Sequence, residues 1–116
     1  MLCRLWRGWT TQSNADMYEE ILKDLIFKEI EERNIEGYER FQLFRNDKND
    51  EVEFITIMYF KTLEGIKQFA GEDYTQAFLP EKERKLLSRF DERVEIIELK
   101  IDQGIQVTEC ENHPKV

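Results

Sequence analysis

The chain has 116 residues, of which 41% are hydrophobic and 36% are charged, with 5 glycines and 2 prolines. This length and composition fit one globular domain and exclude a disordered or fibrous chain. The formal net charge of -8 would repel a phosphate backbone, so nucleic acid is not expected as a partner.

The amino-terminal segment does not have the uninterrupted apolar stretch of a signal peptide, because Arg4 and Arg7 break it. The longest nearly apolar run, 54–60, is far shorter than the roughly 20 residues that cross a bilayer. We therefore expect a cytoplasmic protein with no membrane partner. Two cysteines, Cys3 and Cys110, do not make a disulfide framework, so both are expected to be free thiols.

The first predicted elements are a strand over 2–10 and a helix. The apolar residues of the helix recur at helical spacing, and they are Met17, Tyr18, Ile21, Leu22 and Leu25. Ser13 or Asn14 is the expected cap. Beyond Leu25 the apolar residues move to another face, so the helix is expected to bend or change partners near Phe27.

A hairpin is predicted next, with strands over 38–45 and 52–60 around the polar loop 46–50. A second helix follows, capped by Thr62 and ended by Gly71. Pro80 suits the first position of a further helical turn that carries Leu86 and Leu87. The last predicted strand is 94–101, with a β-bulge or bend at the adjacent Ile96 and Ile97.

This order, β-α-β-β-α-β, predicts an α+β, ferredoxin-like domain with a four-stranded antiparallel sheet. Both faces of strand 52–60 are apolar, with Phe54, Met58 and Phe60 on one and Ile55, Ile57 and Tyr59 on the other. Two helices cover only one face of such a sheet. We therefore expect a homodimer in which a second copy covers the other face, sheet against sheet.

Three segments resemble those of the antibiotic biosynthesis monooxygenase family. They are Arg4-Leu5-Trp6-Arg7-Gly8-Trp9-Thr10, Phe69-Ala70-Gly71-Glu72-Asp73-Tyr74 and Leu87-Ser88-Arg89-Phe90-Asp91-Glu92-Arg93. The resemblance covers about residues 2–101, and it implies a dimeric α+β barrel with a mostly apolar cavity in each protomer. Some members of the family oxidise aromatic polyketide-like compounds with dioxygen and no added cofactor, and others bind and degrade haem.

The resemblance implies no cofactor for this chain, and haem is not expected. Histidine is absent from the segment that resembles the family, since the single histidine is His113, and 94–98 reads Val-Glu-Ile-Ile-Glu where relatives often carry a His-Tyr pair. Cys110 and His113 have the spacing of half a zinc site, but no second pair exists, so no metal is expected. Residues 102–116 are predicted to form a tail or a short extra strand around Ile105 and Val107.

Candidate residues for substrate binding are aromatic or cationic, and no catalytic residue is identified. A dry pocket for an electron-rich aromatic compound needs groups that orient it and stabilise its anion. The candidates are Trp6, Arg7, Trp9, Arg40, Tyr59 and Tyr74. Simpler roles remain open for all of them, namely core or interface packing for the aromatic residues and ion pairs for the arginines.

Two functions follow from these observations. The first is a monooxygenase-like protein that binds a small apolar or aromatic molecule in its cavity and oxidises it without a cofactor. The alternative is a dimer that binds a small ligand without catalysis, and a scaffold role within a larger assembly also remains open. Motifs for phosphate loops, serine triads and paired-cysteine metal sites are absent from the sequence.

Overall fold

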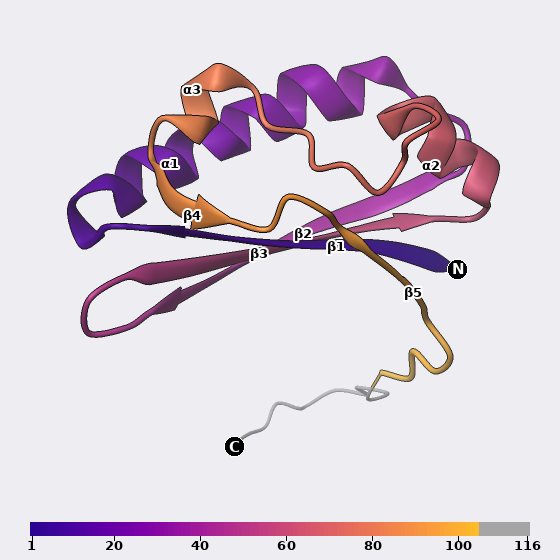
Figure 1. Cartoon of the computed structure of the whole chain (residues 1–116). Coiled ribbons are helices and arrows are strands. Elements are labelled where there is room, and N and C mark those ends of the chain that lie inside the picture. Colours follow the sequence, from indigo (N-terminus) through magenta and orange to yellow (C-terminus); the bar gives the residue numbers. More distant parts are fainter. Residues whose placement is uncertain (105–116) are drawn as a thin grey trace, which may run out of the picture.

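The computed structural model describes residues 1–104, in which all the helices lie on one side of an antiparallel sheet (Figure 1). The elements in chain order are β1 (Leu2–Thr10), α1 (Gln12–Leu25), a π-helical segment (Ile26–Ile30), a 3-10 turn (Glu31–Arg33), β2 (Tyr38–Asp47), β3 (Val52–Phe60), α2 (Leu63–Ala70), α3 (Glu81–Arg84), β4 (Leu87–Phe90) and β5 (Glu95–Glu98). The predicted ferredoxin-like order of elements is confirmed.

The sheet has β1 near its centre. One edge of β1 pairs antiparallel with β3 along the whole strand, and β2 pairs antiparallel with β3 beyond it. The other edge of β1 pairs with β4 near Trp9 and with β5 near Cys3. Two short strands therefore share the fourth position that the sequence assigned to one strand.

The predicted final strand over 94–101 is wrong in its bounds, because β5 covers only Glu95–Glu98. Before it, the chain leaves β1 between Phe90 and Glu95. Two interactions account for this break. The Trp6 indole donates a hydrogen bond to the Asp91 carbonyl oxygen at 2.7 Å. The backbone of 92–94 then pairs with 75–77, through bonds from Ala77 N to Glu92 O and from Val94 N to Thr75 O. β5 keeps a continuous register with β1 across Ile96 and Ile97, so the bulge expected there is absent, and an interruption between Phe90 and Glu95 separates β4 from β5.

The first helix starts earlier than predicted and changes its winding where predicted. Thr11 is the cap, because its hydroxyl oxygen accepts a hydrogen bond from the Asn14 backbone N–H at 3.2 Å. The expected caps Ser13 and Asn14 lie inside the helix, and Met17, placed on the buried stripe, is 60% exposed. From Ile26 to Ile30 the helix is π-helical. The wider turn places the Ile30 side chain in the core, and this residue is 3% exposed.

The rest of the chain shows two further differences, in α3 and in the hairpin loop. Thr62 caps α2 and Gly71 ends it, as expected, with Gly71 at a φ of 91°. Pro80 precedes α3, but this helix ends at Arg84, and Leu87 begins β4 instead of belonging to the helical turn. The hairpin loop is also tighter than predicted, since Lys48 N bonds to Glu51 O.

The two faces of the sheet differ as the alternation of β3 predicts. Phe54, Met58 and Phe60 point toward the helices and are at most 3% exposed. The opposite face carries no helix (Figure 1), and Ile55, Ile57 and Tyr59 there are only partly buried. Pairing across the strands places further apolar side chains on this open face, and they are Leu5, Phe44 and Ile97.

Within residues 1–104, no helix has the length and apolar character needed to cross a membrane. The predictions about Cys110, His113, Ile105 and Val107 lie outside the described residues, and the domain boundary at residue 101 stays a prediction.

Gly8 is required by the position of the Trp6 ring. Both residues point to the helix side of β1, two positions apart, and the indole lies over the Gly8 backbone. A Cβ atom at residue 8 would overlap the Cη2 atom of this ring. The ring is rigid and buried, with 7% of the residue exposed, so it has little freedom to move aside.

We expect Gly8→Ala to lower the free energy of unfolding by about 1–3 kcal/mol, the usual cost of overpacking a core. Chemical denaturation followed by tryptophan fluorescence measures this change. Gly104→Ala is the matched control, because nothing lies within 4 Å of the Cβ position there. An unchanged stability of Gly8→Ala would contradict the described position of Trp6.

Candidate functional site

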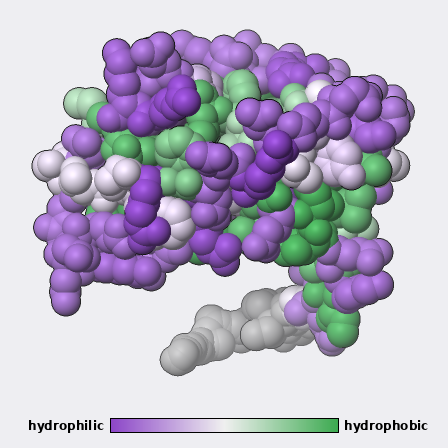
Figure 2. Space-filling model, in the orientation of Figure 1, coloured by the Kyte–Doolittle hydropathy of each residue, from purple (hydrophilic) through white to green (hydrophobic). Residues whose placement is uncertain are grey.

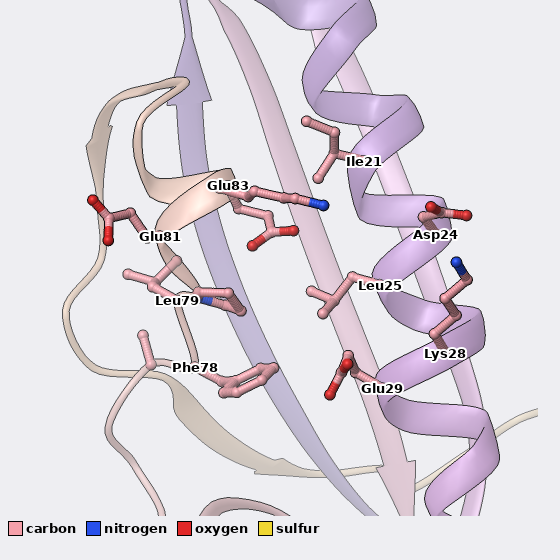
Figure 3. Close-up of a pocket in the computed structure, with 12 residues that line it drawn as sticks. Ile21, Asp24, Leu25, Lys28, Glu29, Phe78, Leu79, Glu81 and Glu83 are labelled. Carbon is pink, nitrogen blue, oxygen red and sulfur yellow. The ribbon is translucent and has the colours of Figure 1, made fainter.

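A cavity of about 720 Å³ lies between the first helix and the segment that leads into α3. In Figure 3, Leu25 and Glu29 point across a gap toward Phe78, Leu79 and Glu83 on the opposite wall. The volume falls within the usual range for small-molecule sites. Its rim carries charged side chains of both signs, and they are Asp24, Lys28, Glu29, Glu81 and Lys82.

A smaller pocket of about 50 Å³ continues the cavity toward the sheet. Leu25, Phe78, Leu79 and Glu83 line both spaces, so the two are neighbours. The floor of the inner pocket comes from the helix-facing side of the sheet, namely Arg4, Trp6, Phe41, Thr56 and Met58. A ligand that enters past the charged rim would therefore meet an interior that is mainly apolar and aromatic. Figure 2 shows the corresponding hydrophobic surface between the hydrophilic helix layer and the strands.

The wall formed by 74–83 is held over the sheet by hydrogen bonds from Arg4. Its guanidinium donates to the carbonyl oxygens of Tyr74 and Gln76, at 3.4 and 2.7 Å. The ring of Phe69 lies 5.1 Å from the guanidinium carbon and contacts Phe78 edge to face. These contacts fix the distance between the wall and β1.

Arg4 is also a buried cation without an ion-pair partner among the described residues. It is 5% exposed, and burial lowers its pKa to about 10, so it remains charged at neutral pH. No carboxylate of residues 1–104 lies within ion-pair distance of its guanidinium. Its two hydrogen bonds to carbonyl groups leave other N–H donors on the side that lines the inner pocket. The floor of the pocket therefore favours a neutral or anionic oxygen over a second cation.

Glu83 is a buried carboxyl group with an unused acceptor. The residue is 4% exposed, and its Oε1 atom has no hydrogen-bond partner among the described residues. Burial raises the pKa of this carboxyl group, the Glu83 backbone N–H and the charge of Lys82 oppose the shift, and the neighbouring Glu29 adds to it. An unpaired buried polar group is costly, so its presence in the lining of both spaces needs an explanation.

Tyr18 lines the inner pocket from α1 and is 1% exposed. Burial raises the pKa of its hydroxyl group above the ordinary value, and the negative charge of Glu83 adds to this shift. Tyr18 therefore stays neutral and presents an O–H group. Its ring packs edge to face on Phe54 with centroids 4.9 Å apart.

Of the six residues predicted to bind substrate, Trp6 lines the inner pocket. Tyr74 is partly buried at the edge of the core, with the Lys67 ammonium 5.9 Å from its ring centroid. The other four point to the open face of the sheet. There, Arg7 lies 3.7 Å from Glu53, the Arg89 guanidinium stacks 3.9 Å from the Trp9 ring, and Arg40 lies over Tyr59, which donates to Gln42. A binding role for all six residues stays a prediction.

Arg4, Tyr18 and Glu83 were not predicted as site residues. The alternation of β1 places Arg4 on the same face as Trp6, and this signal was available. Tyr18 was assigned to the helix stripe without a further role. Glu83 was not singled out, because nothing in Glu81-Lys82-Glu83-Arg84 separates one inward carboxyl group from its exposed neighbours.

No protein-family model matches the sequence, and no curated protein matches it. Solved structures do match. A dimeric ferredoxin-like protein from an uncultured marine organism aligns with a TM-score of 0.63 at 13% identity, over 89% of this chain and 91% of the other. The haem degrader MhuD from Mycobacterium tuberculosis, with two haems bound in its active site, aligns with a TM-score of 0.55 at 16% identity, over 90% of this chain and 100% of the other. At these identities the likeness shows the ferredoxin-like fold.

The haem-bound neighbour counts against the expectation that haem is unlikely, so we tested the cavity for iron ligands. Its lining contains neither histidine nor cysteine. Met58 and Tyr18 belong to side-chain types that ligate haem iron, but both line the 50 Å³ inner pocket and are almost completely buried. The lining does not fit an axially ligated haem. Within residues 1–104, no group of three histidine, cysteine or acidic residues could hold a metal ion.

We expect Glu83 to make stability fall as pH rises. Because its pKa in the folded state lies above the ordinary value of 4.5, the folded state keeps the proton that the unfolded state loses first. Its stabilising effect is complete below pH 4.5 and is lost as pH rises through the folded-state pKa. Denaturation of the wild type and of Glu83→Gln between pH 4 and pH 8 measures the difference.

The difference in free energy of unfolding, wild type minus Glu83→Gln, should decrease over this range. Glu81→Gln on the exposed rim is the matched control for the loss of one negative charge. Parallel curves for the Glu83→Gln protein and the wild type would contradict a raised pKa at Glu83.

Proposed function

We propose that this protein is a homodimer that binds a small aromatic or polycyclic molecule in the cavity of each protomer. The observation that carries the proposal is the 720 Å³ cavity, which narrows onto a buried floor of Trp6, Arg4 and Tyr18. Aromatic walls suit a flat apolar ligand, and a few polar groups at the inner end would orient it. The haem-bound active site of the structural neighbour supports a ligand-binding role for this fold.

The dimer is proposed from the open face of the sheet. Phe44 and Ile97 on this face are 46% and 42% exposed, beside the partly buried Leu5, Ile55 and Ile57. A continuous apolar surface of this kind is usually an interaction site. A second copy is the occupant we infer, because a neighbour of the same fold is a dimeric ferredoxin-like protein.

Oxidation of the bound molecule is the finer part of the proposal, and it follows the resemblance to the antibiotic biosynthesis monooxygenases. In the simplest such reaction, a CH₂ group between aromatic rings and one O₂ give a ketone and one water, so the substrate supplies all four electrons. The charged Arg4 guanidinium on the pocket floor would stabilise the anion formed when the substrate loses a proton. Binding without turnover is the alternative function.

The proposed dimer is tested by a substitution that places a negative charge on the open face of the sheet. Wild type should have roughly twice the chain mass of 14.1 kDa in sizing with light scattering at micromolar concentration. Ile57→Asp should shift it toward the monomer, because an unpaired carboxylate would be buried between the sheets. Met17→Asp, on an exposed position of α1, is the control and should remain dimeric. A monomeric wild type would refute the dimer.

Ligand binding is tested by filling the cavity. Leu79→Trp places a bulky ring where both spaces meet and should weaken binding of dithranol, a hydroxylated anthrone, by about tenfold or more in calorimetry. Oxygen uptake with dithranol, if the protein catalyses it, should fall in parallel. Met17→Trp adds the same ring on the outside of α1 and should bind as wild type does. Haem is titrated alongside.

The outcomes separate the two functions. Tight binding of dithranol without oxygen uptake would favour the non-catalytic alternative, whereas equal binding by Leu79→Trp and wild type would refute this cavity as the site. Haem binding that Leu79→Trp abolishes would overturn the expectation of a haem-free protein.

A further inference from the structure

The Glu83 carboxyl group has a role beyond the general shape of the cavity. We propose that Glu83 selects the ligand by forming a hydrogen bond to a hydroxyl group at the end of the molecule that enters first. This inference rests on the proposed function and names the ligand chemistry that the same site accepts. It specifies an aromatic compound that carries a phenolic or enolic hydroxyl group.

The first argument is the placement of the group. Glu83 stands on α3, where backbone bonds from Glu83 N and Arg84 N to Pro80 O fix the single helical turn. Its side chain extends from this turn toward Leu25 on the first helix (Figure 3). It lines the cavity and the inner pocket, so it stands where one opens into the other.

The second argument is the unused acceptor. Only 4% of Glu83 is exposed, yet its Oε1 atom has no hydrogen-bond partner among the described residues. None of the polar side chains that line the two spaces bonds Oε1. They include Tyr18 of α1, Glu29 of the π-helical segment, Lys82 of α3 and Arg4 of β1. A ligand donor would remove the cost of this unpaired oxygen, which gives a bound hydroxyl group an advantage over a methyl group.

The third argument is the charge of the pocket floor. An ammonium group would also donate to Glu83, but Arg4 lines the same inner pocket as a buried cation without an anionic partner. A second positive charge at this depth would be repelled in a medium of low dielectric constant. A neutral hydroxyl group avoids this repulsion, and its oxygen can in turn accept from nearby donors. The combination of Glu83 and Arg4 therefore favours a hydroxyl group over an amine.

The test compares two probes that differ at one position, 2-naphthol and 2-methylnaphthalene. Their dissociation constants are measured by calorimetry or fluorescence for the wild-type dimer and for two variants at Glu83. Wild type should bind 2-naphthol about tenfold more tightly than 2-methylnaphthalene. Glu83→Leu should bind both within about threefold of each other, through loss of affinity for 2-naphthol alone.

Glu83→Gln keeps an acceptor of similar shape, so it should retain a preference for 2-naphthol larger than that of Glu83→Leu. Glu64→Leu, at an exposed position of α2 outside the cavity, is the control and should keep the full preference. Melting curves confirm that each variant is folded, and Glu83→Gln provides the comparison should Glu83→Leu fail to fold.

Equal binding of the two probes by wild type, or an undiminished preference in Glu83→Leu, would overturn the role of Glu83 and leave the aromatic site standing. Absence of binding of either probe to wild type would overturn the proposed function itself, and this inference with it.

Discussion

The hydrogen bond from the Trp6 indole to the Asp91 carbonyl oxygen, 2.7 Å long, is the contact on which the candidate site depends. It holds the chain where the edge strand breaks, and 92–94 pairs there with 75–77 instead of β1. Arg4 lies two residues before Trp6 on the same face of β1. Its guanidinium donates hydrogen bonds to the carbonyl oxygens of Tyr74 and Gln76 in the cavity wall. The cavity wall is therefore fixed to the central strand β1. The edge strand that would pair with β1 in an ordinary ferredoxin-like sheet is divided into β4 and β5.

The same anchoring explains how charged groups come to lie in the interior. A wall held over the sheet at fixed distance leaves space that side chains do not fill, and Arg4 and Glu83 both face this space. Each is expensive to bury alone, because neither has an ion-pair partner among the described residues. Groups retained at such cost are commonly found at functional sites, where perturbed pKa values also cluster.

The sequence predicted the architecture well because the pattern of β3 is strict. Alternation over Val52–Phe60 determines two faces, and helical spacing together with Thr62 and Gly71 determines α2. The division of the last strand escaped prediction, since it depends on an indole from β1 that bonds a carbonyl group 85 residues away in the chain. Glu83 was not predicted for a similar reason. All four residues of 81–84 are charged, and which carboxyl group among them is buried depends on the elements that pack opposite.

The aromatic ligand is proposed to bind in the cavity and not on the open face of the sheet. Methyl resonances of leucine and isoleucine, recorded while 2-naphthol is added, distinguish these two surfaces because both carry such groups. We expect the shifts to concentrate at Leu25 and Leu79, which line the cavity, and to spare Ile55 and Ile57. Shifts confined to Ile55 and Ile57 would place the ligand on the open face and refute the cavity as the binding site.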